Sequence, residues 1–315
     1  MADYSSVIDR TGATGLIQDQ YAREIIQGAA ESSIVLRLAR RLPNMSSNRT
    51  SMPVLDALAT AYFVNGDTGL KQTTEVSWSN KYIYAEEIAT IVPIPEAVLA
   101  DSSYDIWGEL RPRMVEAIGK TIDAAILVGT NKPANWPNDI LAGATAASQT
   151  VDHSSFSGDY YDEILGEGGV FSLVEDDGFM VTGSIGLQTM KARLRGLRDS
   201  AGMPIFMRSM QDRTRYELDG TPMEFLLNGS VSAATALMFS GDWNQLVYSI
   251  RQDITYKILD QAVLQDGSGN IIYNLAQQDM VAMRVVMRLG FQVPNPINAM
   301  NTNASTRYPW AVLVP

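Results

Sequence analysis

Cysteine and histidine are almost missing from this chain. Its 315 residues contain no cysteine and a single histidine, His153. Without thiols the chain cannot form a disulfide scaffold or a thiolate metal site, and one imidazole cannot build a histidine-rich metal site. Histidine is also the side chain best suited to proton transfer near neutral pH. The composition therefore argues against metal enzymes and leaves little acid–base machinery.

Long apolar runs and an excess of positive charge are also lacking. No segment approaches the roughly 20 apolar residues of a membrane span. The opening MADYSSVIDR is not a charged start followed by an apolar signal core, so we expect synthesis inside the cell. The net charge of −11 opposes general affinity for nucleic acid, because that affinity comes from cations that displace counterions around phosphates. Such acidity suits a soluble protein, or one that lies beside DNA without adhering to it.

Nucleotide and catalytic motifs are absent as well. The sequence has no GxxxxGK[ST] phosphate loop and no GxGxxG after a predicted strand. His153 lies between Asp152 and Ser154, but adjacency in sequence is not triad geometry, and we interpret it as a polar loop residue. We interpret the acidic run 175–177 as the solvated tip of a turn, and the segment 266–270 lacks the bidentate acid of a calcium loop. We expect no enzyme activity, no cofactor and no metal site.

One long two-faced helix, predicted over 103–129, organises the chain. Polar and apolar side chains recur on opposite sides of it at steps of three and four residues. Pro112 disfavours helical geometry at the preceding residue, so we expect a kink or a late helix start there. The polar side comprises Glu109, Arg113, Glu116, Lys120 and Asp123, and the apolar side comprises Trp107, Leu110, Met114, Ile118, Ile122 and Ala125.

An extended hairpin is predicted before this helix. The turn formers NGDTG at 65–69 separate two runs with apolar residues, a pattern that favours strand, turn and strand. Apolar and polar residues then alternate from Thr74 to Ile88. A hairpin this polar on one side cannot bury itself within its own domain. We therefore expect it to lie on another surface.

Basic residues cluster near the end of the second of two helices predicted at the start of the chain. The helical patterns cover 16–27 and 33–42, and the cluster comprises Arg37, Arg40 and Arg41. Two interpretations remain open for it: a solvated face at a helix end, or a contact with an acidic neighbour or with nucleic acid.

The later part of the chain alternates predicted strands and helices. A short strand is predicted at 178–181, and Ser184 suits the N-cap of a helix over 185–198. Near the end, every odd position from 281 to 293 is apolar, which predicts a long strand with one apolar face. Those positions are Val281, Met283, Val285, Met287, Leu289, Phe291 and Val293.

Four segments combine in a recognisable order. The first is the alternating arm that runs through VPIPEAVLADS into the 103–129 helix, and the second, 178–206, contains an L-x-D-x-x-G-x-P turn. The third joins FLLNGSVS to GDWNQLVYSIRQDITYKI, and the fourth is MVAMRVVMRLGFQVPNPINAM. Together, over 16–301, they resemble the major capsid proteins of tailed bacteriophages with the HK97-type fold. The chain departs from the family at Ser230, where those proteins often have proline.

The resemblance implies an α+β protein with the HK97-like capsid fold. An N-terminal arm would cover 1–44 and an extended β-hairpin loop would cover 65–90. The peripheral domain, with its spine helix at 103–129, would comprise 45–64, 91–130 and 246–301. The axial α/β domain would comprise 131–245 and 302–315.

The resemblance also implies a structural function. Copies of the chain would form pentamers and hexamers of an icosahedral phage head around double-stranded DNA, assembled in the host cytoplasm and located in the virion. Implied partners are other copies, a portal protein, possible decoration proteins, and packaged DNA through non-specific contacts; no membrane is implied. Because the chain begins almost at the arm, we expect any scaffolding protein to be separate, and a protease is also possible. The inter-subunit contact candidates are Trp78, Tyr82, Tyr84, Lys71, Arg37, Arg40 and Arg41.

Covalent crosslinking is not expected. Some relatives join a loop lysine to an asparagine near the C-terminus through an isopeptide bond, with help from a glutamate. Lys71 and Lys81 are the available loop lysines, and Asn295 and Asn298 are available asparagines, but 276–315 contains no glutamate. We therefore predict that this chain forms no such bond.

Three other functions remain as alternatives. An encapsulin, a cellular compartment of the same fold, would enclose enzymes instead of a genome. A hydrolase built on 151–245 would need a base, and only His153 is available. A DNA-binding protein would use the basic cluster, against the overall acidity of the chain.

Overall fold

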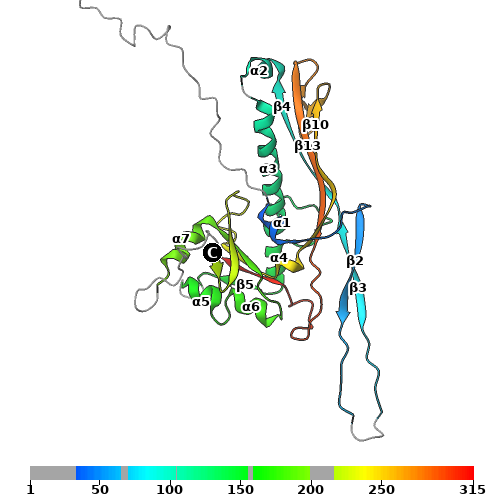
Figure 1. Ribbon diagram of the computed structural model, residues 1–315, viewed down its shortest axis with the longest axis vertical. Helices are drawn as coiled ribbons and strands as arrows, with labels where there is room; N and C mark the ends of the chain where they lie inside the picture. Colours follow the sequence, from blue (N-terminus) through cyan, green and yellow to red (C-terminus); the bar gives the residue numbers. More distant parts are fainter. Residues whose placement is uncertain (1–32, 65–69, 104, 155–158, 199–215) are drawn as a thin grey trace, which may run out of the picture.

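The computed structural model describes residues 33–64, 70–103, 105–154, 159–198 and 216–315. A compact lobe is built on a six-stranded sheet, and an elongated lobe combines a long helix with a four-stranded sheet (Figure 1). A two-stranded hairpin extends away from both lobes (Figure 1). The predicted α+β class is confirmed.

The sheet of the compact lobe has the strand order β5-β14-β9-β6-β8-β7. Strand β14, near the C-terminus, pairs parallel to β5 and antiparallel to β9, so the end of the chain lies inside this sheet. Strand β6 pairs parallel to β8. The strands are β5 (Thr150–Asp152), β6 (Gly183–Leu187), β7 (Tyr216–Leu218), β8 (Thr221–Leu226), β9 (Met238–Gly241) and β14 (Trp310–Val314).

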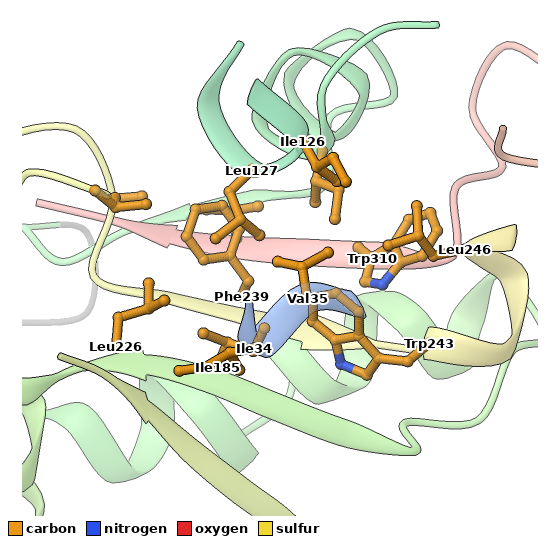
Figure 2. Packing of buried hydrophobic residues seen from close by; sticks show 14 of the residues in the cluster. Ile34, Val35, Ile126, Leu127, Ile185, Leu226, Phe239, Trp243, Leu246 and Trp310 are labelled. Carbon is orange, nitrogen blue, oxygen red and sulfur yellow. The ribbon is translucent and has the colours of Figure 1, made fainter. Parts of the chain in front are cut away.

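Helices and aromatic side chains complete the core of this lobe. Trp243, in a short 3-10 turn, and Trp310 are both nearly inaccessible to solvent, and their rings lie 6.0 Å apart. Figure 2 shows Ile34 and Val35 packed among them, which places the first described helix in the core. The helices are α1 (Ile34–Leu38), α4 (Ile140–Ala146), α5 (Tyr160–Leu165), α6 (Val170–Asp176) and α7 (Gln188–Gly196).

The elongated lobe carries the strand with the strongest sequence signal. Strand β13 (Met280–Gln292) lies between β10 (Val247–Leu259) and β4 (Glu86–Pro95), antiparallel to both. All of its predicted apolar positions within the strand are buried except Val281, which is half-buried. The predicted long strand is confirmed. Two residues of β1 (Arg40–Arg41) add a parallel edge to β10.

The long helix α3 (Ile106–Val128) runs beside this sheet (Figure 1). The Asp105 carboxylate caps it by accepting the Gly108 amide at 3.0 Å, and Gly129 ends it in the left-handed conformation at φ 70°. Both ends therefore use standard capping chemistry. Pro112 lies inside the helix, so the predicted late start at Pro112 is wrong. The helix instead begins one turn and more before it.

Asp123 was predicted on the exposed polar side of α3, and this prediction is wrong. Its side chain is fully buried, whereas the helical period placed it with exposed residues. The carboxylate accepts hydrogen bonds from the Ile34 amide at 3.2 Å, the Val35 amide at 3.3 Å and Asn228 Nδ2 at 2.7 Å, and also from the Ser33 hydroxyl. Burial raises the pKa of Asp123, and these donors oppose the rise. The residue thus joins α3, the start of α1 and the loop after β8.

The two strands predicted on either side of 65–69 pair as a hairpin, and the predicted turn itself lies outside the described residues. Strand β2 (Arg49–Ala57) pairs antiparallel to β3 (Ser77–Tyr84). The alternating stretch predicted as one long arm is interrupted at Ala85, whose amide donates to Asn48 O at 2.9 Å. Strand β4 then starts at Glu86 and joins the β13 sheet. Alternation continues through the break because both strands have a period of two.

Two predicted elements of the compact lobe are shifted along the chain. No strand forms at 178–181; the strand is β6, which starts at Gly183. Ser184 is no helix cap, because it lies within β6 and its hydroxyl is 2.8 Å from that of Ser240 on β9. Helix α7 begins at Gln188 without a side-chain cap. Strand β6 is buried on both faces, so no alternation marked it.

The remaining elements lie at the far end of the elongated lobe. Helix α2 (Glu96–Asp101) follows β4, and β11 (Val263–Gln265) pairs with β12 (Ile271–Asn274) around the predicted tight turn. The Asp266 carboxylate accepts the Asn270 side-chain amide and backbone amides of that turn, which lower its pKa. Within the described ranges, no helix is both long and apolar enough to cross a membrane.

Candidate functional site

The hairpin is the most exposed apolar part of the described chain. Its two arms continue past the paired strands, where Tyr62 Oη donates to Gln72 O at 2.8 Å and the Thr60 amide donates to Thr74 Oγ1 at 3.2 Å. Phe63 is fully exposed and Leu70 is 90% exposed. Side chains of this size contribute about 1.5–3 kcal/mol each when they leave water. The hairpin therefore exposes apolar surface that a contact with another molecule could bury.

The three predicted aromatic anchors lie on β3 of this hairpin, in different environments. Trp78 is 67% exposed and faces solvent opposite Leu55. Tyr82 is half-buried under the Arg49 guanidinium, which lies 4.4 Å from the ring centroid. Tyr84 is also half-buried, and its carbonyl accepts Trp136 Nε1 at 3.1 Å. Trp78 is therefore the anchor candidate with the most area left to bury.

Sequence reasoning missed Phe63 and Leu70. They flank the NGDTG turn, and the presence of large apolar residues beside a turn was the available signal. Lys71, a predicted contact residue, follows Leu70 and is exposed. It lies at the distal end of the hairpin, close to these two apolar side chains in sequence. Together with Trp78, they make up the hairpin surface.

The basic cluster is divided between two elements. Helix α1 ends at Leu38, so Arg40 and Arg41 lie on strand β1 and not at a helix end, which corrects the prediction. Arg37 Nη2 pairs with Glu224 Oε2 at 3.0 Å, within the same chain. Arg41 donates to Asn44 Oδ1 at 3.1 Å, and both strand arginines are exposed. The three arginines thus form no single basic patch on one helix.

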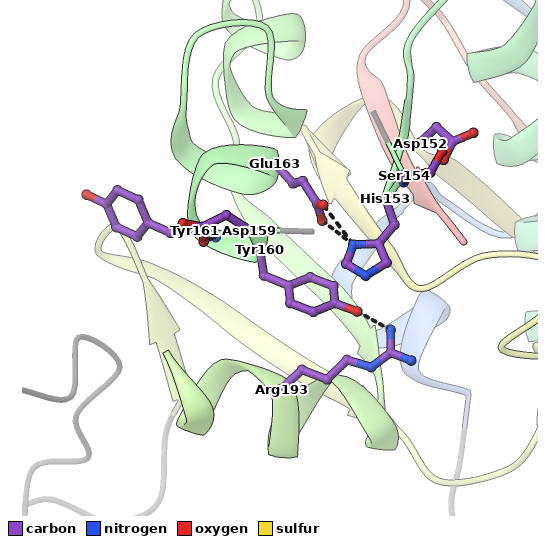
Figure 3. A network of polar contacts seen from close by, with 8 residues as sticks. All are labelled: Asp152, His153, Ser154, Asp159, Tyr160, Tyr161, Glu163 and Arg193. Atoms are coloured by element: carbon purple, nitrogen blue, oxygen red, sulfur yellow. Dashed lines mark hydrogen bonds and ion pairs between the residues drawn. The ribbon is translucent and has the colours of Figure 1, made fainter. Parts of the chain in front are cut away.

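Among the described residues, His153 has a specific partner but forms no catalytic triad. Its Nδ1 lies 2.7 and 2.9 Å from the two carboxylate oxygens of Glu163, and its ring stacks on Tyr160 at 4.2 Å (Figure 3). Arg193 donates to the Tyr160 hydroxyl. The Asp152 carboxylate instead accepts the Ser154 amide at 2.8 Å. The ring is packed and paired although 30% of the side chain is exposed, and the arrangement joins α5, α7 and the end of β5.

The pKa of Glu163 follows from this packing. Its side chain is fully buried, and burial raises the pKa, while the hydrogen bond from His153 opposes the rise. The Glu163 carboxylate thus joins α5 to His153, which follows β5. Ser155, the other serine beside the histidine, lies outside the described residues.

The acidic run contains a buried residue that the sequence placed at a solvated tip. Asp177 is only 5% exposed, and its carboxylate accepts Gln149 Nε2 at 2.7 Å, Asn301 Nδ2 at 2.7 Å and the Tyr308 amide at 2.8 Å. Glu175 and Asp176 remain exposed. Asp177 therefore fastens the segment after β13 to the end of α6. Among the described residues, no group of three or more potential ligands is arranged to hold a metal ion.

Known proteins are similar to this chain over most of its length. The family model of the phage capsid family matches residues 13–301. The major capsid protein of Staphylococcus phage 80alpha is 25% identical over 284 residues, which cover 89% of this chain and 82% of that protein. The probable major capsid protein gp17 of Mycobacterium phage D29 is 25% identical over 293 residues, covering 90% of this chain and 89% of that protein.

Solved structures are similar over nearly the full length. A chain of Microbacterium phage Oxtober96 superposes with a TM-score of 0.83 and 36% identity, covering 98% of this chain and 100% of that chain. A chain of Mycobacterium phage Adephagia gives a TM-score of 0.82 and 31% identity, covering 98% of both chains. The predicted HK97-like capsid fold is confirmed. This protein therefore belongs to the phage capsid family.

Proposed function

We propose that this chain is the major capsid protein of a phage and that its copies assemble into the pentamers and hexamers of an icosahedral shell around double-stranded DNA. The observation that carries the proposal is the hairpin, whose large apolar side chains are exposed in the single chain. A neighbouring copy would bury them. Membership of the phage capsid family supports the same function.

We assign the parts of the chain to this function as follows. The hairpin is the extended loop, and the sheet around β13 with α3 belongs to the peripheral domain. The six-stranded sheet belongs to the axial domain, at the centre of each capsomer. The proposed ranges are 1–44 for the arm, 65–90 for the loop, 45–64, 91–130 and 246–301 for the peripheral domain, and 131–245 and 302–315 for the axial domain.

The proposed location is the capsid of the virion, after assembly in the host cytoplasm. A portal protein would fill one vertex, and a separate scaffolding protein, a protease or decoration proteins would act on the same shell. The net charge of −11 suits a wall beside packaged DNA, because a net negative charge opposes general affinity for nucleic acid. We propose no enzyme activity, and the packing of His153 against Glu163 supports a structural role for that residue.

Electron microscopy of the purified chain after size exclusion tests the proposal. We expect uniform closed shells, or rings of five and six copies. The diameter also separates a genome container from a small enzyme-filled compartment of the same fold. Monomers or dimers alone, persisting at high concentration and with a co-expressed scaffolding protein, would contradict the proposal.

We predict that assembled shells contain no covalent crosslink. Lys81 Nζ donates to Val293 O at 3.0 Å in its own chain, which holds this lysine at the base of the hairpin, and 276–315 offers no glutamate to assist the reaction. Shells boiled in denaturant and run on a gel should give one band at the mass of the single chain, 34.5 kDa. A ladder of multimers would refute the prediction, and Lys71→Arg would then show whether the exposed lysine forms the bond.

A further inference from the structure

A polar cavity lies where the base of the hairpin meets both lobes. Its volume is about 410 Å³, and residues from β3, the end of β13, α4 with the residues before it, and the segment before β14 line it. In Figure 1, the segment after β13 passes between the compact lobe and the hairpin. The Ile297 amide donates to Leu55 O at 3.2 Å, and Asn298 Nδ2 donates to Asp177 O at 2.7 Å. The walls of the cavity are thus held from both sides.

Two cationic side chains line this cavity, and none of the described residues that line it is an aspartate or a glutamate. Arg307 is only 3% exposed, and Lys81 is half-buried. Within the described ranges, neither forms an ion pair with a carboxylate, although the chain carries a net charge of −11. Buried cations without a paired anion are uncommon, because removal of a charge from water is costly.

Among the described residues, neither cation has a hydrogen-bond partner for all of its N–H groups. Arg307 has five N–H groups. Nε donates to Asn295 Oδ1 at 3.1 Å, Nη1 to Asn301 O at 2.8 Å and Nη2 to Asn295 O at 3.1 Å. Two N–H groups of the guanidinium remain. Lys81 uses one of its three protons on Val293 O, so two remain there as well.

The two positive charges act on each other. Burial lowers the pKa of Lys81, the charge of Arg307 lowers it further, and Asp56 partly opposes this. Burial also lowers the pKa of Arg307, against the influence of Asp177 and Asp56. Asp177 is occupied by three donors, and Asp56 is exposed outside the cavity wall. An anion inside the cavity would relieve the repulsion between the two cations.

Neutral donors stand at the mouth of the cavity. The side chains of Asn138 and Ser305 line it and are exposed, and neither side chain makes a hydrogen bond within the described ranges. We propose that this cavity is a binding site for an oxyanion, which Lys81, Arg307, Asn138 and Ser305 hold by charge-assisted and neutral hydrogen bonds. The oxyanion is either free phosphate or the acidic side chain of a second copy of this chain. This site lies apart from the hairpin surface and needs no assembly to exist.

Thermal unfolding of the unassembled full chain in sodium phosphate tests the site, with sodium chloride added to hold the ionic strength constant. We expect a saturable rise in the midpoint of roughly 2–4 °C once phosphate exceeds its dissociation constant severalfold. Lys81→Met keeps the alkyl stem and should lose the rise. Ser305→Ala, an exposed position, should reduce it without affecting folding. Lys257→Met, an exposed lysine on β10, should keep the full rise.

Comparing the phosphate-induced rise between variants removes the general effect of phosphate. Phosphate also stabilises folded proteins by exclusion from their surface, an effect that does not saturate and is the same in all variants. An equal rise in wild type, Lys81→Met and Ser305→Ala would overturn the proposal, whether or not the chain forms shells. In closed shells, persistence of the rise identifies free phosphate as the ligand. If the phosphate-induced rise is lost in closed shells, and Lys81→Met also destabilises those shells, the ligand is a carboxylate of the neighbouring copy.

Discussion

Replacement of Asp123 by alanine should lower the free energy of unfolding by about 3–5 kcal/mol. The carboxylate is fully buried and accepts four hydrogen bonds, two of them from the first amides of α1. The first amides of a helix have no partner within the helix, so a buried helix start needs an acceptor from elsewhere. Alanine would leave these donors unsatisfied and would release α1 from α3. Urea unfolding of the unassembled chain, followed by circular dichroism, measures the loss.

Two further variants separate this role from a general effect on α3. Asp105→Ala removes the exposed N-cap of the same helix and should cost only about 1 kcal/mol. Asp123→Asn keeps the volume and one acceptor but turns an amide donor toward other donors, so its loss should fall between those of the two alanine variants. A loss from Asp123→Ala no larger than that from Asp105→Ala would show that the four hydrogen bonds contribute little.

The position of Asp123 shows where helical periodicity stops being informative. The period correctly predicted a long two-faced helix, and its apolar side is buried at Met114, Ile118 and Ile122. It cannot reveal that a segment about 90 residues earlier in the chain packs on the other side. A carboxylate on a helix face has the same spacing whether water or a helix start satisfies it. Only the tertiary contact decides between them.

Strands follow the same logic. Strand β13 was predictable because apolar side chains alternate along it, and the hairpin because turn formers separate its strands. Strand β6 was misplaced because every one of its residues is buried, which removes the alternation. The break at Ala85 was missed because the period of two continues across it while the pairing partner changes from β2 to β13. Pairing partners are tertiary information.

Of the candidate binding residues, some could be predicted from the sequence and others could not. Trp78 could be selected from sequence because an aromatic residue on a polar hairpin has no core to enter, and the structure leaves it exposed. The oxyanion cavity could not be selected, since Lys81 and Arg307 are more than 220 residues apart and no motif joins them. Its donors meet only because the segment after β13 returns beneath the hairpin.

Replacement of Trp78 by alanine should leave the single chain folded and should impair its assembly. The side chain is 67% exposed, so its removal should change the free energy of unfolding by no more than about 0.5 kcal/mol. At a subunit contact, a buried aromatic anchor contributes about 2 kcal/mol or more, which is roughly a 30-fold change in affinity per contact. In a shell, each copy inserts its own hairpin into a neighbour and accepts the hairpin of another. The protein concentration needed for assembly should therefore rise by at least roughly 30-fold.

Size exclusion and electron microscopy of wild type and variant at matched concentrations measure this effect. Trp78→Phe keeps an aromatic side chain at the same place and should restore most of the assembly, which distinguishes loss of apolar contact area from loss of the indole N–H. An unfolding midpoint equal to that of wild type is the control for folding. Normal shells from Trp78→Ala at wild-type concentration would mean that Phe63 and Leu70, near the end of the hairpin, provide the apolar contact without it.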